Sequence, residues 1–169
     1  MNGRRRSGET DGTKVLDVMT HLVVTLRPED SIQDAARRMV SNRISGAPVV
    51  EDGRPVGIVS ETDLVAAFAP TARRRAALPA SDPLTFILAG IAPRSATGIT
   101  VSDVMTRDVV AVGPEASLWE AASLIERHGI SRLPVVDDHG YLVGIVARAD
   151  LVRSMARDTG ELSVPVAKR

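Results

Sequence analysis

The chain has 169 residues, a formal net charge of zero and 44% hydrophobic residues, which are the values of an ordinary globular protein. The balanced charge argues against nucleic acid as the main partner, and the lack of cysteine excludes disulfides, thiolate chemistry and cysteine-based metal sites. Only 2% of the residues are aromatic, so we expect a core of Val, Ile, Leu, Ala and Met.

We expect no secretory signal at the N-terminal residues. The basic residues at 4–6 are not followed by an apolar stretch, so the segment is not a secretory signal. No window of the sequence approaches the roughly 20 apolar residues that a membrane helix needs. We therefore expect a soluble, cytoplasmic protein with no membrane contact.

The most informative feature of the sequence is an internal repeat. The segment from Val15 to Phe68 recurs, with modest changes, from Val101 to Met155. A period of this length does not fit solenoid repeats, whose units have roughly 20 to 50 residues. Two copies of one small unit leave a pseudo-two-fold seam, and ligand clefts commonly form at such seams.

Each repeat predicts the order β-α-β-β-α. A short β-rich run, at 22–26 and again at 109–112, follows the sequence Asp-Val-Met-Thr. Ser31 and Ser117 are predicted to cap the helices that come next. Apolar residues at helical spacing predict one buried face on each helix: Ile32, Ala35, Ala36, Met39 and Val40 in the first repeat, and Leu118, Ala121, Ala122 and Ile125 in the second.

A hairpin and a second helix complete each repeat. Asp-Gly and His-Gly are hairpin turn signals because glycine accepts a positive φ. The predicted strands are 47–50 and 56–60, then 133–136 and 142–146, and the predicted second helices are 62–68 and 149–157.

We divide the chain at the repeat boundaries. Units of this size are small to stand alone, so we expect the two copies to share one buried face. The expected parts are a disordered N-terminus (1–13), a first domain (14–68), a linker with a short helix at 83–92 (69–99), a second domain (100–157) and a flexible tail (158–169).

The motifs of the repeat resemble a known family. Asp-Val-Met-Thr, the capped helix, I-S-x-x-P-V-V and G-I-V-x-x-x-D occur in this order in both copies. Together they resemble a tandem cystathionine-β-synthase (CBS) domain pair. The resemblance implies an α/β module of two β-α-β-β-α units packed through their sheets with pseudo-two-fold symmetry. It also implies clefts that bind AMP, ADP, ATP or S-adenosylmethionine, and a regulatory role, often as a dimer of pairs.

Ser60 and Asp63 are the leading candidates for a ligand site. A carboxylate just past a strand end can accept hydrogen bonds from ribose hydroxyls. The Ser60 hydroxyl and the N–H groups of the helix start can donate to a phosphate. The same two residues can instead cap the helix. Spacing alone leaves both roles open, and the resemblance favours ligand binding.

The two copies differ where a phosphate would bind. The second repeat has Ala147 at the position of the Ser60 hydroxyl, and it has Arg132 where the first repeat has a glycine. In the family, a basic residue at the position of Arg132 reaches phosphate, and the arginine fork suits that role. We therefore predict a stronger cleft built from Ser60, Asp63 and Arg132, and a weaker one around Asp150.

Other residues near these motifs have two open interpretations. Arg148 either supplies a second phosphate contact or points to solvent. The candidate walls of the base pocket, which can equally be simple core packing, are Ile44, Ser45, Ile130 and Ser131.

Catalysis is not expected. The three histidines lie far apart at positions without metal-ligand spacing, and no nucleophile–base arrangement stands out. Trp119, the single tryptophan, either anchors a partner surface or packs near Phe86 of the linker.

The predicted function is a non-catalytic sensor that needs no resident cofactor and binds an adenosine-type ligand. We expect a homodimer of CBS pairs that signals by conformational or oligomeric change, with its output on a separate effector protein or in its own assembly. The alternative is a structural or interaction protein with degenerate clefts, which Ala147 and Gly46 favour.

Overall fold

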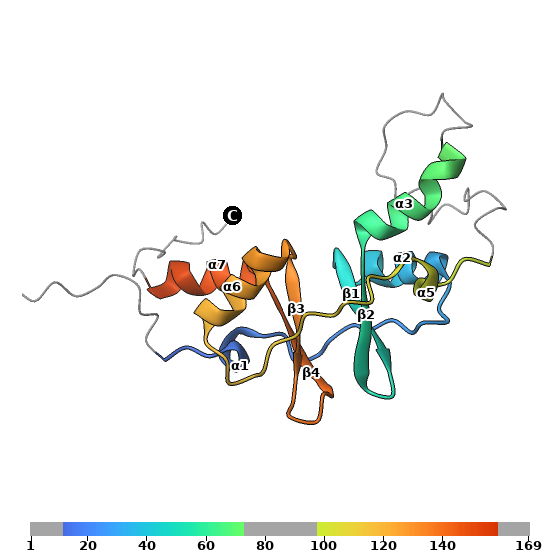
Figure 1. The fold of residues 1–169 in the computed structure, drawn as a ribbon. Helices are drawn as coiled ribbons and strands as arrows, with labels where there is room; N and C mark the ends of the chain where they lie inside the picture. The colour runs from blue at the N-terminus through green and yellow to red at the C-terminus, as the bar shows by residue number, and fades with distance from the viewer. Residues whose placement is uncertain (1–11, 73–97, 159–169) are drawn as a thin grey trace, which may run out of the picture. The chain divides into compact units, whose positions relative to one another are not determined.

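The computed structural model describes residues 12–72 and 98–158 (Figure 1). The predicted linker helix (83–92) lies outside the described residues, as do all but two residues of the predicted disordered N-terminus (1–13) and all but the first residue of the predicted tail (158–169). In chain order the elements are α1 (Val15–Val18), α2 (Ile32–Ser41), β1 (Gly46–Glu51), β2 (Arg54–Ser60), α3 (Glu61–Ala72), α5 (Val101–Val104), α6 (Leu118–His128), β3 (Arg132–Val136), β4 (Leu142–Ala147) and α7 (Arg148–Asp158).

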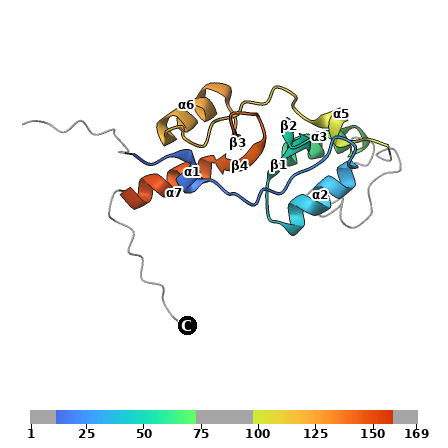
Figure 2. The ribbon, with the colours of Figure 1, turned by 90° about the horizontal axis from the view of Figure 1, so that it is seen from below.

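The described residues form two compact units, each with its own two-stranded sheet. The first-repeat unit, with β1 and β2, comprises residues 22–72, 98–109 and 140–142. The second-repeat unit, with β3 and β4, comprises residues 12–21, 110–139 and 143–158. The two repeats exchange their short N-terminal helices: each helix belongs to the unit that the other repeat forms. Figure 2 shows α1 of the first repeat beside α7, and α5 of the second repeat beside α3.

The exchanged helices are held by backbone hydrogen bonds and by one buried valine each. The Val15 N–H donates to the Ala116 carbonyl at 2.9 Å, and the Val101 N–H donates to the Asp30 carbonyl at 2.9 Å. Both valine side chains are fully buried, in the second-repeat and the first-repeat core respectively. Each hydrophobic core therefore contains a residue from the other repeat.

These short helices were not predicted. A carboxylate caps each of them: Asp17 accepts from the Lys14 N–H and Asp103 from the Thr100 N–H, both at 2.8 Å. The T-x-x-D pattern before Val104 is a recognisable capping signal, but the first repeat has Lys14 in place of the threonine.

The two longer N-terminal helices begin as predicted. The Ser31 hydroxyl accepts from the Asp34 N–H and the Ser117 hydroxyl from the Glu120 N–H, both at 3.1 Å. The predicted buried faces are confirmed with two exceptions: Val40 lies at the edge of its face and is exposed, and Ala122 is only half-buried.

The hairpins are also confirmed, with strands one or two residues longer than predicted. β1 and β2 pair antiparallel, with Gly46 opposite Ser60 at one end. Asp52 and Gly53 at the turn have φ values of 50° and 76°. A positive φ at two consecutive turn positions matches the right-handed twist of the strands, which explains the Asp-Gly pair.

The predicted first strands at 22–26 and 109–112 are wrong. Each run forms a single parallel bridge, from Leu26 to Val49 and from Val112 to Val135. Leu26 donates to the Pro48 carbonyl and accepts from the Val50 N–H, but the preceding carbonyl, of Thr25, accepts from the Arg38 guanidinium at 2.8 Å. A further ladder bond from the run to β1 would need an N–H from Pro48, and proline has none, so the pairing ends at Leu26.

Candidate ligand-binding site

The first candidate residues lie where β2 passes into α3. Oδ2 of Asp63 accepts from the Ser60 N–H at 2.7 Å and from the Ser60 hydroxyl at 2.6 Å. Both side chains are half-buried. Asp63 is the third residue of α3, so these two bonds close the helix start in the manner of a capping box.

The second oxygen of Asp63 is differently placed. Within residues 12–72 and 98–158, Oδ1 of Asp63 receives no hydrogen bond and no ion pair. A carboxylate oxygen carries two lone pairs. The capping role of Asp63 therefore leaves one oxygen that can accept from a ligand hydroxyl, and the two roles weighed for this residue are chemically compatible.

Ser45 and Ile44 adjoin this junction in the same unit. The Glu61 N–H donates to the Ser45 carbonyl at 3.1 Å, which ties the start of β1 to the start of α3. The Ile44 side chain is half-buried and packs against the first-repeat core, whereas Ser45 is exposed. Ile44 therefore packs against the core, and its role as a wall of the base pocket stays a prediction.

The equivalent junction of the second repeat lies where β4 passes into α7. Oδ2 of Asp150 accepts from the Ala147 N–H at 2.8 Å, and no hydroxyl is present at Ala147. Oδ1 of Asp150 forms an ion pair with Arg153 at 3.4 Å. Both oxygens of Asp150 are therefore engaged, unlike those of Asp63.

Two arginines adjoin the second junction. The Arg148 N–H donates to the Ser131 carbonyl at 2.9 Å, and the Arg148 guanidinium donates to the Ile130 carbonyl at 2.9 Å. Arg132 follows Ser131 in the chain and is half-buried. Its Nε and Nη2 each lie 3.4 Å from Oγ of Ser131. The Arg148 guanidinium is anchored to the Ile130 carbonyl, although the side chain is exposed to solvent.

The structure thus places the candidate residues in two groups. It brings Ser60 and Asp63 together, beside Ile44 and Ser45, in the first-repeat unit. Arg132, which we grouped with Ser60 and Asp63, belongs to the other unit. It lies there with the remaining candidates, Ile130, Ser131, Arg148 and Asp150.

Glu61 is a further residue of the first junction, which sequence reasoning did not single out. It is the first residue of α3 and stands between the two candidate residues of the first junction. Its counterpart in the second repeat is Arg148, so the aligned repeats already contained the signal, a reversal of charge at one position.

Neither metal binding nor membrane insertion is indicated in the part of the chain that the structure describes. There, no three His, Asp or Glu side chains gather in a way that could hold a metal ion. The same residues contain no helix with the length and apolar character to cross a bilayer. Trp119 is exposed on α6, and Phe86 lies outside the described residues.

Comparison with known proteins identifies the two repeats. The family model of the CBS domain matches residues 15–70 and 101–157. Protein MJ1426 of Methanocaldococcus jannaschii is 37% identical over 153 residues, which cover 83% of this chain and 90% of that protein. The chain spans 21% and 24% of the length of two longer curated relatives.

Solved structures of CBS pairs are similar to the fold. One is CBSX2 of Arabidopsis thaliana in complex with AMP, with a TM-score of 0.67 and 30% identity, covering 88% of this chain and 99% of that one. Another is the CBS domain pair of protein MJ0100 in complex with 5′-methylthioadenosine and S-adenosylmethionine, with a TM-score of 0.68, 25% identity and the same coverage. The chain therefore belongs to the CBS-domain family and carries two CBS domains in tandem.

Proposed function

We propose that this protein is a regulatory, non-catalytic sensor that binds an adenosine-containing ligand: AMP, ADP, ATP or S-adenosylmethionine. The observation that carries the proposal is the geometry of Asp63. Its Oδ2 is fixed by two hydrogen bonds from Ser60, so the carboxylate has one orientation, and its Oδ1 remains available to a ribose hydroxyl. A preorganised acceptor binds without a further cost in side-chain entropy.

Two solved relatives support the class of ligand. CBSX2 was crystallised with AMP, and the pair of MJ0100 with 5′-methylthioadenosine and S-adenosylmethionine. All three compounds contain adenosine and differ in the group at the 5′ position. Recognition of the nucleoside is therefore the shared chemistry, and a ribose-binding carboxylate is the group it requires.

A ligand signals only as far as it binds one conformation better than another. Coupling free energies in such systems are typically about 1 to 3 kcal/mol. We propose that occupancy changes the conformation or the assembly of the protein, as a homodimer of CBS pairs acting on an effector protein.

The test is isothermal titration calorimetry with AMP, ADP, ATP and S-adenosylmethionine on the wild type and on Asp63→Asn. Asparagine keeps the shape of the side chain but removes the charge that attracts hydroxyl donors. We expect Asp63→Asn to weaken the best ligand by about tenfold or more, the scale of one charge-assisted hydrogen bond.

Asp103→Asn is the matched control. Asp103 also accepts from a backbone N–H and a hydroxyl, both of Thr100 and both at 2.8 Å, at the third position of a helix. The Asp103→Asn variant should bind every ligand with the affinity of the wild type. Equal affinity of Asp63→Asn and wild type for all four ligands would refute the proposed site.

One observation favours the alternative, an interaction protein with degenerate clefts. The Ser60 hydroxyl donates to Asp63, so in this structure it is committed to the cap. The absence of any thermal shift with the same ligand panel would support that alternative.

A further inference from the structure

The two strand-to-helix junctions have the same backbone arrangement. The first residue of each helix donates its N–H to the carbonyl of the serine directly before the first hairpin strand: Glu61 to Ser45 at 3.1 Å, and Arg148 to Ser131 at 2.9 Å. The third residue of each helix accepts the N–H of the last strand residue. A comparison of the side chains at the two junctions is therefore like for like.

The side chains at these equivalent positions differ in charge. The first junction has Gly46, Ser60, Glu61 and Asp63, a formal charge of −2. The second has Arg132, Ala147, Arg148 and Asp150, a formal charge of +1. Within the described residues, Glu61 forms no ion pair with any arginine or lysine, so its charge is not neutralised by a close partner.

The acceptors differ in the same direction. Asp63 has one oxygen left for a neutral hydroxyl donor, whereas Asp150 has one oxygen on a backbone N–H and the other near Arg153. The guanidinium of Arg148 donates one hydrogen bond to the Ile130 carbonyl. Four N–H donors of its five remain, and the carbonyl holds the group in place.

We propose that Glu61 and Arg148 select ligands by charge. Glu61 lowers the affinity of the first junction for phosphorylated ligands relative to neutral or cationic adenosyl compounds. The reason is that a phosphate beside Glu61 and Asp63 is repelled by their negative charges. Arg148 sets the second junction in favour of a phosphate. This inference rests on the proposed function and reverses the expectation that Ser60 serves a phosphate.

The experiment measures the ratio of the affinities for AMP and adenosine, which differ by the phosphate alone. The variants are Glu61→Gln, Glu61→Arg and Arg148→Gln in the full chain. Because like charges a few ångströms apart interact by about 1 kcal/mol or more, we expect Glu61→Arg to raise the AMP-to-adenosine ratio about tenfold. Glu61→Gln should raise it by less, and Arg148→Gln should lower it.

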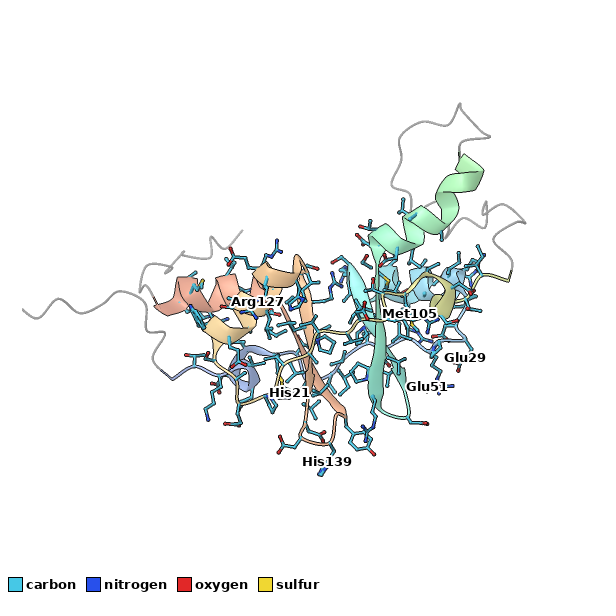
Figure 3. The ribbon with its side chains drawn as sticks, viewed as in Figure 1. His21, Glu29, Glu51, Met105, Arg127 and His139 are labelled. Carbon is cyan, nitrogen blue, oxygen red and sulfur yellow. The ribbon has the colours of Figure 1, made fainter. Side chains whose placement is uncertain are left out.

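Glu51→Arg is the matched control, because it makes the same change in charge at the opposite end of the hairpin from Ser60, opposite Arg54 (Figure 3). Its ratio should equal that of the wild type. If Glu61→Arg still binds adenosine but its ratio matches that of Glu51→Arg, the charge selection is overturned, even where Asp63→Asn loses binding and the proposed function stands. If wild type binds neither these two compounds nor ADP, ATP and S-adenosylmethionine, or if Asp63→Asn binds all of them unchanged, the proposed function and this inference fail together.

Discussion

The guanidinium carbon of Arg54 lies 4.9 Å from the centroid of the Tyr141 ring, which joins the hairpin turns of the two repeats. Beside this pair the Leu142 N–H donates to the Gly53 carbonyl at 2.9 Å. A cation over an aromatic face is attracted by the electrons of the ring. Residues 140–142 of the second hairpin thus belong to the first-repeat unit.

Removing either member of this pair should lower stability modestly. We expect Arg54→Ala to reduce the free energy of unfolding by about 0.5 to 1 kcal/mol, the value for an exposed cation–π contact. Arg54→Lys keeps the cation and should lose less. Urea denaturation measures both changes, and a double-mutant cycle with Tyr141→Ala isolates their interaction. A coupling energy of zero in that cycle would mean that the contact contributes nothing.

The glycines of the second hairpin strands should tolerate no side chain. A Cβ at Gly57 would lie 2.9 Å from Cγ of Met105 and closer still to its sulfur, and Figure 3 shows Met105 beside β2. We expect Gly57→Ala to destabilise the protein by about 1 to 3 kcal/mol, the usual cost of overpacking. Thermal unfolding measures it.

Gly113→Ala is the control for that substitution, because a Cβ at Gly113 meets no atom within 4 Å. It should leave the melting temperature almost unchanged. Met105→Ala should rescue part of the loss in Gly57→Ala. A loss in Gly57→Ala that persists in full beside Met105→Ala would show that Met105 is not the obstacle.

Short-range signals account for the elements that were predicted correctly. The Ser31 cap and the Asp52–Gly53 turn depend on neighbours within four residues, so the local sequence determines them. The repeat added the family resemblance, since its motifs recur in both copies.

Long-range pairing accounts for what was missed. Val15 is buried in the core of the other repeat and is held there by contact with Ala116, about a hundred residues away. No local sequence pattern records such a contact. Leu26 shows the converse. Its surroundings have β-type composition, yet Pro48 of the neighbouring strand has no N–H to donate the next ladder bond. Local spacing also could not separate the two roles of Asp63, because capping and ligand binding need the same carboxylate.

The cap of α2 should make stability depend on pH. The Ser31 hydroxyl donates to Asp34 and, with the nearby arginines Arg37 and Arg38, holds the pKa of that carboxyl below its ordinary value of 3.8. A lowered folded-state pKa stabilises the protein above the ordinary pKa. That stability is lost as the pH falls through the folded-state value.

Ser31→Ala should therefore cost about 1 kcal/mol near neutral pH and less in acid, where Asp34 is protonated. Urea midpoints at neutral pH and at acid pH measure the difference. Ser117→Ala is the control, because its hydroxyl accepts from a backbone N–H, which does not titrate. If acid reduces the destabilisation caused by Ser31→Ala and by Ser117→Ala by the same fraction, the Asp34 carboxylate has no part in the effect.

The exchange of short helices makes a prediction that crosses the repeats. Val101→Ala should cost on the order of 2 kcal/mol, because it leaves a cavity at a fully buried position. The loss should appear in the first-repeat core, so amide hydrogen exchange should speed up in β1 and β2 rather than in β3 and β4. Val15→Ala should show the opposite pattern. Leu22→Ala, at a side chain that is 92% exposed, should change neither hairpin. If Val101→Ala instead loosens β3 and β4, each short helix packs with its own repeat and the exchange is wrong.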